Sequence, residues 1–185
     1  MTYYGAKHLA DSFRTVRKNT IAIAEEIAED KYGFKAAPEV MSVGEMLAHL
    51  AVSPMWQIDL HTSKIEAVDF AFFAARQQSG KVAEQALRSK AEIVQALKDN
   101  GERFAAFLEG LDEAALQSTV SFPAPVQPPT KTRFEMLLGP KEHEMHHRGQ
   151  LMLVQRLLGQ VPPLTRARQQ MQAQAQQSAA AAGRA

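Results

Sequence analysis

The stretch His143-Glu144-Met145-His146-His147-Arg148-Gly149-Gln150 decides how this chain folds. It lies in a segment from Phe134 to Leu158 whose apolar periodicity predicts one helix. Residues four apart in a helix lie about 40° apart around its axis, so the imidazoles of His143 and His147 can face one point. Such a pair holds two imidazoles at chelating distance, so the stretch predicts a helix with two candidate metal ligands.

The helical phase predicts which side of this segment faces the core. The side chains within about 80° of His143 are Gln150, Leu151, Val154, Leu157 and Leu158. The side chains that fall toward the opposite side are Glu144, Arg148, Gln155 and Arg156. We therefore expect both histidines to face the buried stripe, where each needs a polar partner because an unpaired buried polar group is costly.

The spacing of this pair does not by itself assign a metal site. The chain has six histidines in 185 residues, and pairs four apart arise readily by chance. Two core histidines could equally be hydrogen-bonded to the backbone or to a carboxylate. A metal also needs a third ligand, because two imidazoles make neither a closed nor a catalytic site.

The composition is that of a soluble globular protein, with 45% hydrophobic and 22% charged residues. A length of 185 residues suits one domain with a sizeable core. The net charge is +1 with Lys and Arg spread along the chain, which gives no electrostatic argument for nucleic acid or an anionic membrane. Cysteine is absent, which excludes a disulfide framework, a Cys-based zinc site and a cysteine nucleophile. We find no signal-peptide pattern and no apolar run of membrane-spanning length, so we expect a cytoplasmic protein.

Apolar periodicity and capping signals predict four long helices. They are expected over residues 7–29, 43–60, 81–111 and 134–158. Capping boxes at Ser42–Glu45 and Thr132–Glu135 mark the starts of the second and fourth helices, and a third at Ser89–Glu92 is an alternative start for the third helix.

Proline and glycine predict the interruptions. Pro54 should kink the second helix or end it one residue earlier, and Gly139-Pro140 should kink or restart the fourth. Residues 65–78 are expected to form a short helix that crosses one end of the bundle, separated from the third helix by Gly80. The four prolines of Ser118–Pro129 predict a surface connection, and Gly159 should end the fourth helix.

His49 is the best candidate for a third ligand. It shares a face of the second helix with three apolar side chains within about 60°, which are Met46, Val52 and Trp56. That face should turn to the core and meet the fourth helix. His8 lies at the margin of the first helix and is expected at the surface, and His61 points about 120° away from His49.

Two strings of residues carry a family resemblance: Met46-Leu47-Ala48-His49-Leu50 and His143 to Leu151. Arg156-Leu157-Leu158-Gly159 followed by Pro162-Pro163 supports them. By these strings, between Lys7 and Pro163, the chain resembles the DinB-like, or YfiT-like, four-helix-bundle proteins.

The resemblance implies an all-α fold: an antiparallel four-helix bundle over residues 1–163, with a Pro-rich loop before the last bundle helix. Residues 164–185 form a Gln/Ala-rich C-terminal tail, expected to be partly helical or disordered. The resemblance also implies a homodimer. It implies a divalent ion, zinc or nickel, held by three histidines, which by matching position are His49, His143 and His147.

The resemblance also implies roles for the neighbours of the ligands. Gln150 should hydrogen-bond near the metal, and His146 should be a surface or packing residue. Gly149 should let another helix approach closely, and Arg148 should make a structural ion pair.

Three histidines leave coordination positions open, as in catalytic zinc sites. Characterised members of the family resemble S-transferases that use low-molecular-weight thiols such as bacillithiol or mycothiol. The resemblance thus implies a metal-dependent thiol S-transferase that acts on a small molecule, with Trp56 and Met46 either as an apolar wall or as plain core residues. One alternative is a metal-dependent hydrolase, although Glu45, Glu142 and Glu144 offer no assigned general base. The other is a non-enzymatic, stress-associated metal-binding bundle.

Overall fold

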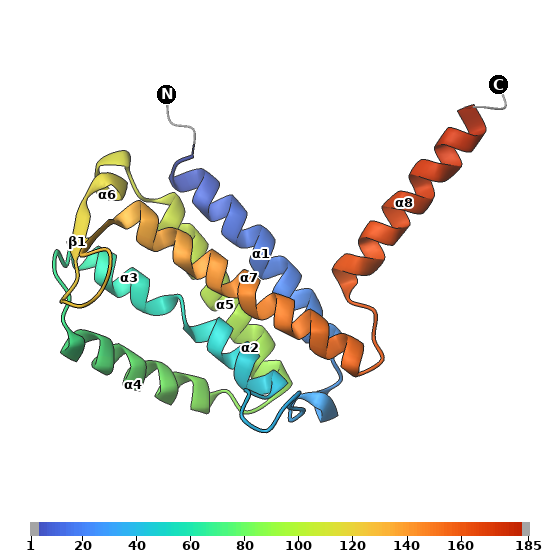
Figure 1. Ribbon diagram of the computed structural model, residues 1–185, viewed down its shortest axis with the longest axis horizontal. Helices are drawn as coiled ribbons and strands as arrows, with labels where there is room; N and C mark the ends of the chain where they lie inside the picture. The colour runs from blue at the N-terminus through green and yellow to red at the C-terminus, as the bar shows by residue number, and fades with distance from the viewer. Residues whose placement is uncertain (1–3, 183–185) are drawn as a thin grey trace.

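In the computed structural model, which describes residues 4–182, the chain is a helical bundle with a short hairpin (Figure 1). Its elements are α1 (Ala6–Glu26), the 3-10 helix η1 (Glu29–Lys31), α2 (Val43–Val52), α3 (Met55–Thr62), α4 (Phe70–Ala86), α5 (Lys90–Glu109), α6 (Glu113–Gln117), β1 (Thr119–Ser121), β2 (Thr130–Thr132), α7 (Arg133–Leu157) and α8 (Pro163–Ala182). The expected all-α class is confirmed. Within residues 4–182, no helix combines the length and apolarity needed to cross a bilayer.

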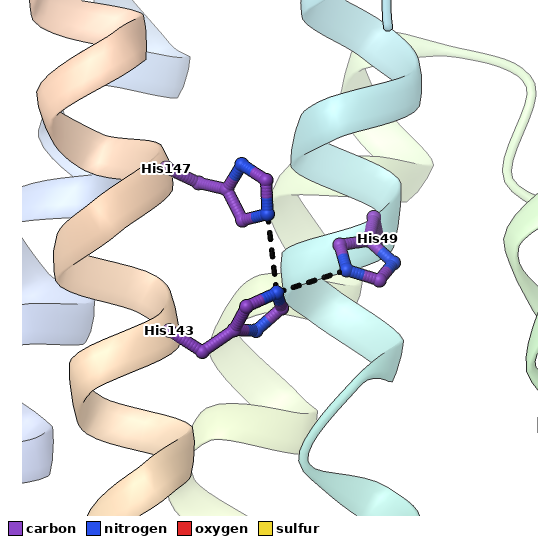
Figure 2. A group of neighbouring side chains, drawn as sticks. All are labelled: His49, His143 and His147. Carbon is purple, nitrogen blue, oxygen red and sulfur yellow. Dashed lines mark hydrogen bonds between the residues drawn. The ribbon is translucent and has the colours of Figure 1, made fainter.

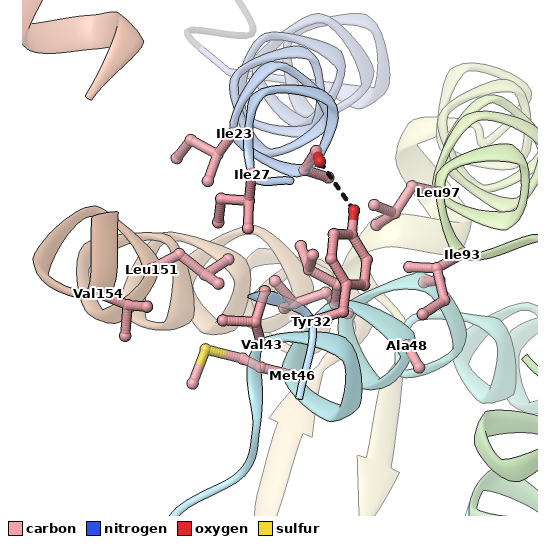
Figure 3. Close-up of a cluster of buried hydrophobic side chains, with 14 residues drawn as sticks. Ile23, Ile27, Tyr32, Val43, Met46, Ala48, Ile93, Leu97, Leu151 and Val154 are labelled. Carbon is pink, nitrogen blue, oxygen red and sulfur yellow. Dashed lines mark hydrogen bonds between the residues drawn. The ribbon is translucent and has the colours of Figure 1, made fainter. Parts of the chain in front are cut away.

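The bundle core is formed by α1, α2 with α3, α5 and α7, and its buried side chains gather toward two ends. The larger cluster (Figure 3) joins Ile23 and Ile27 at the end of α1 to the length of α2, to the start of α5 and to Leu151 on α7. The second cluster joins Phe13 on α1 to Phe104 on α5 and to residues at the start of α7. These contacts show that α1 and α7 run one way while α2, α3 and α5 run the other, so the expected bundle of four core helical segments is present.

Capping boxes fix where three of these helices begin. At each of Ser42, Ser89 and Thr132 the hydroxyl accepts from the backbone N–H three residues on, and the glutamate there accepts from the cap N–H. All three boxes predicted from the sequence are confirmed. The third core helix therefore starts at Lys90, and the alternative start at Lys81 is wrong.

The two prolines placed within the predicted helices behave differently. Pro54 separates α2 from α3, as expected for a residue that lacks an N–H and collides with the preceding turn. Pro140 lies inside the continuous α7, so the expected restart of that helix is wrong. Side chains are buried on both sides of Pro140: Leu137 before it packs in the second cluster and Leu151 after it packs in the larger one, so α7 spans both ends of the core.

Helix α4 differs most from the sequence prediction. It runs from Phe70 through Gly80 to Ala86, so Gly80 lies inside a helix and does not separate two. The helix lies along α2 (Figure 1) instead of crossing one end of the bundle. Asp69 caps it by accepting from the N–H of Phe72 at 2.7 Å. No residue of α4 is fully buried, so the helix lacks the apolar stripe that would have revealed it.

The Pro-rich segment forms the hairpin of β1 and β2, an antiparallel pair in which Val120 faces Lys131. The prolines lie between the strands, and Val120 is buried in a third small cluster with Leu60, Val68 and Met136. At the other end of α7, Gly159 has φ +76° and ends the helix as expected. The Gln/Ala-rich tail is helical as α8 up to Ala182, and residues 183–185 lie outside the described part of the chain. Helix α8 projects from the bundle (Figure 1) and is tied to α1 by an Arg166–Glu26 ion pair.

The buried face of α7 agrees only in part with the one that the helical phase predicted: His147, Leu151 and Val154 are buried as expected. Glu144 and Gln155, placed on the side opposite His143, are 1% and 0% exposed, whereas Gln150 and Leu157 are exposed. Glu144 is buried because a cation lies next to it: Arg17 on α1 donates through Nε to both of its carboxylate oxygens, at 2.9 and 3.0 Å. His143 consequently lies at the margin of the core and not at its centre.

Arg17 connects all four core segments of the bundle. Besides Glu144 on α7, its guanidinium donates to the carbonyl oxygen of Leu97 on α5 at 2.9 Å and to that of Leu50 on α2 at 2.8 Å. A Cβ on Gly101 would lie 2.8 Å from Cγ of Arg17, so the close approach expected at Gly149 occurs at Gly101 instead. A Cβ on Gly149 would meet no atom within 4 Å.

We expect Arg17→Met to lower the free energy of unfolding by about 3–5 kcal/mol, because it leaves the buried Glu144 carboxylate unpaired. The double variant Arg17→Met/Glu144→Leu should recover most of that loss, since it removes both charges together. Urea denaturation measures these differences. The control is Arg14→Met, whose ion pairs with Glu102 and Glu109 are on the surface and should cost at most about 1 kcal/mol. A double variant no more stable than the single one would contradict this account.

His61 lies in a second buried polar cluster, as a neutral ring. Its Nδ1 accepts from Nη1 of Arg133 at 2.8 Å, and its Nε2 lies 3.0 Å from Oε1 of Gln57. Burial and the neighbouring Arg133 lower the pKa of His61 from 6.5 to about 4. The unfolded chain therefore binds a proton that the folded chain does not between these two values, and folding stability must fall as the pH drops through that window.

We expect the wild-type protein to lose about 2 kcal/mol of stability at His61 when the pH is lowered from about 7 to about 5, at about 1.4 kcal/mol per pKa unit. His61→Gln keeps an acceptor for Arg133 and does not titrate, so it should lose correspondingly less. Urea unfolding of both proteins at both pH values measures how much stability each one loses. Subtracting the two losses removes the contribution of the other histidines, which both proteins share. Identical pH dependence in the two proteins would show that His61 does not carry the effect.

Candidate metal centre

Three histidines from two helices point toward one another between α2 and α7 (Figure 2). Nε2 of His143 lies 3.2 Å from Nε2 of His49 and 3.1 Å from Nε2 of His147. A donor nitrogen of each ring lies within 4.8 Å of the others, so the cluster could hold a metal ion. The structure thus brings together the three residues that the sequence singled out.

The spacing of these nitrogens suits a tetrahedral ion. With Zn–N bonds of about 2.0–2.1 Å, two ligands at a tetrahedral angle lie about 3.3 Å apart. The two Nε2–Nε2 distances, 3.1 and 3.2 Å, are close to that separation. Two of the three pairs of donor nitrogens therefore have the spacing that a tetrahedral ion needs, and the third pair lies within 4.8 Å.

The hydrogen-bond partners of the rings also favour a cation. Nδ1 of His49 lies 2.8 Å from a carboxylate oxygen of Glu84, and Nδ1 of His147 lies 2.7 Å from the amide oxygen of Gln150. Both oxygens accept, so each Nδ1 donates and each Nε2 presents a lone pair. Nε2 of His143 contacts the Nε2 atoms of both other rings, but it can donate a proton to only one of them. In at least one of the two contacts, therefore, two nitrogen lone pairs face each other, which is repulsive. A cation at the centre would satisfy all three nitrogens.

The electrostatics keep these rings in the form that ligates metals. Burial and the neighbouring histidines lower the pKa of His143 to about 4. Burial also lowers the pKa of His147, against the opposing effect of its hydrogen bond to Gln150. Both rings are therefore neutral near pH 7, and a neutral imidazole is the form that binds a metal.

Glu84 is the site residue that sequence reasoning missed. A carboxylate that accepts from the far nitrogen of a ligand histidine fixes its tautomer and raises its basicity. Glu84 reaches His49 because Phe73, Gly80 and Glu84, spaced seven and four residues apart, form one partly buried stripe of α4. That stripe was available in the sequence, but the interpretation of Gly80 as a helix end concealed it.

The remaining predicted residues lie outside the cluster. His8 is exposed and accepts from the N–H of Gly5, and His61 is buried elsewhere with Arg133. His146 is exposed, as expected, and lies 3.3 Å from Nε2 of Gln150. The ion pair expected of Arg148 is not formed with any residue in 4–182. The buried ion pair of α7 is instead formed by Glu144, four residues before Arg148, with Arg17 of α1.

A cavity of about 510 Å³ adjoins the cluster between α2–α3 and α4. His49 and Glu84 line its end nearest the three rings, and Trp56 lines its wall. Of the two residues expected as an apolar wall, Trp56 is therefore in place, whereas Met46 is packed in the main core.

Comparisons with known proteins agree with this architecture. The family model described as the DinB superfamily matches residues 12–151, a range that contains all three histidines. The uncharacterized protein YjoA of Bacillus subtilis (strain 168) is 25% identical over 154 residues, which cover 83% of this chain and 91% of that protein. The crystal structure of this DinB-like protein matches with a TM-score of 0.62 at 24% identity, covering 83% of this chain and 92% of that chain. The structural likeness bears on the fold alone.

We expect Glu84→Gln to weaken zinc binding by about 10–100-fold, because the amide does not raise the basicity of His49 as a carboxylate does. Competition against a chromophoric chelator measures the dissociation constant. Glu92→Gln, a change in an exposed capping glutamate on α5, is the matched control and should leave zinc affinity unchanged. Equal affinities for the wild-type protein and Glu84→Gln would show that the Glu84–His49 contact is not part of the metal centre.

Proposed function

This chain belongs to the DinB superfamily, and on that premise we propose that it binds one divalent ion, zinc or nickel, through His49, His143 and His147. The observation that carries the proposal is the convergence of three Nε2 atoms that cannot all find a hydrogen-bond donor among themselves. Three nitrogen ligands leave a tetrahedral ion with one open position, the arrangement of catalytic sites and not of closed structural ones.

We further propose that the protein is a metal-dependent thiol S-transferase acting on small molecules. A divalent ion in this site would lower the pKa of a thiol and so supply a nucleophile at neutral pH. The chain has no cysteine, so that thiol must belong to a small-molecule cosubstrate. The three histidines hold the ion, Glu84 orients His49, and the adjoining cavity is large enough for the organic part of a substrate.

The two alternatives have less support from the geometry. A hydrolase needs a general base near the ion, but Glu144 is committed to Arg17 and Glu84 to His49. A purely structural ion would be needed to join α2 to α7, yet Arg17 already joins these helices through Leu50 and Glu144. Both observations favour an ion that is available for chemistry.

Metal content of the purified protein tests the site. We expect about one divalent ion per chain in the wild-type protein and in His146→Ala, whose imidazole is exposed next to the cluster. His49→Ala and His147→Ala should lose the ion. No bound ion in the wild-type protein after zinc or nickel is offered would refute the metal site.

Turnover tests the reaction class. We expect zinc- or nickel-loaded protein to consume an electrophile such as an activated aryl halide only when a low-molecular-weight thiol is present. The sulfur forms a bond to carbon, the halide leaves with its electron pair, and the thiol proton passes to solvent. Loaded protein that accelerates no thiol transfer, or that hydrolyses esters without thiol, would count against the transferase and for an alternative.

A further inference from the structure

The cavity between α2–α3 and α4 has a glycine, Gly80, in the middle of its α4 wall. Phe73, Gln77, Gly80 and Glu84 line the cavity at helical spacing, and a Cβ on Gly80 would meet no atom within 4 Å. Glycine inside a helix costs about 1 kcal/mol relative to alanine. The chain therefore carries an unfavourable residue at the one position of this stripe where a larger side chain would fill the space.

The walls of the cavity are apolar and aromatic. Val52, Met55 and Trp56 line it from α2–α3, and Phe73 lines it from α4. Its volume of about 510 Å³ lies in the range of sites that bind small molecules. A ligand that fills it must therefore have an apolar body, either an aromatic ring or a branched alkyl group.

The charged side chains that line the cavity are Asp59, Arg76, Lys81 and Glu84, and their formal charges sum to zero, but they differ in whether they have a partner. Arg76 is paired with Asp59 at 2.9 Å and packs over the ring of Phe72. Glu84 is bound to His49 at 2.8 Å. Lys81 also lines the cavity, and it forms no ion pair with any residue of the described chain. An anionic group of a ligand could therefore pair with Lys81 without breaking an existing contact, whereas a cationic group would have to displace one, so a ligand with an anionic group fits best.

We propose that this cavity binds a small organic anion with an aromatic or branched apolar body, which Trp56 and Phe73 enclose and whose charge faces Lys81. Because His49 and Glu84 form one end of the cavity, this molecule is the electrophilic substrate, an assignment that rests on the proposed function. The anion selectivity itself concerns binding and does not depend on a metal.

Two fluorescent probes that differ by one charge test the proposal. Anilinonaphthalene sulfonate carries an anionic group, and phenylnaphthylamine is its uncharged analogue. Trp56 is the single tryptophan of the chain and lines the cavity, so energy transfer from it reports binding there. We expect both probes to bind once per chain, with the sulfonate about three- to tenfold tighter, in the metal-free and in the zinc-loaded protein.

Two variants with matched controls decide the result. Gly80→Leu should fill the cavity and abolish binding of both probes without lowering the thermal midpoint, because leucine favours the helix over glycine. Gln78→Leu places the same side chain on α4 outside the cavity lining and should bind normally. Lys81→Gln should remove the preference for the sulfonate, whereas Lys131→Gln on β2 should keep it.

Each outcome bears on one part of the proposal. Normal probe binding by Gly80→Leu would refute the cavity as the site, and an unchanged sulfonate preference in Lys81→Gln would refute the anion selectivity. Suppose that Gly80→Leu abolishes probe binding and Lys81→Gln removes the sulfonate preference, but the protein binds no metal. The proposed function then fails, and the cavity remains a binding site for organic anions. If metal binds and these variant effects are absent, the proposed function stands and this proposal fails.

Discussion

The arrangement of the bundle depends on one buried guanidinium. Arg17 extends from α1 to the backbone of α5 and α2 and to the carboxylate of Glu144 on α7. Two of these partners are sequence neighbours of the candidate ligands, since Leu50 follows His49 and Glu144 follows His143. The hydrogen bonds that hold the helices together therefore also set the separation of the histidines, and the donor set is preorganised by the polypeptide.

Functions are divided between the core helices and the outer helix. Helices α2 and α7 supply the three imidazoles and bury their other faces in the main core. Helix α4 buries no residue fully, yet it supplies the carboxylate that orients His49 and one wall of the cavity. A helix without a large buried face can be altered at its inward positions at little cost to the fold. The residues of α4 are thus suited to determine which molecules would reach an ion bound there, while the core holds the three histidines in place.

Much of the fold and the donor set could be predicted from short-range patterns. The capping boxes located the starts of three helices, and the four-residue spacing of His143 and His147 with the phase of His49 identified the cluster. Long-range pairing could not be predicted in this way. Arg17 and Glu144 are 127 positions apart, and the burial of Glu144 was missed because nothing near it in the sequence shows that its charge is compensated. Glu84 was missed because α4 has no buried stripe and Gly80 resembled a helix end.

His49 and His143 are 94 positions apart, whereas His143 and His147 share one turn of α7. In the unfolded chain only the local pair can hold an ion together, so an ion bound by all three residues would close a long loop that the unfolded chain leaves open. Such an ion would act as a reversible cross-link in a protein that has no disulfides. It would stabilise the folded state to the extent that it binds the three histidines of the folded chain more tightly than the two that the unfolded chain offers. Chelation would then change the resistance of the chain to unfolding and proteolysis as well as its chemistry, which links the lifetime of the protein to the supply of metal.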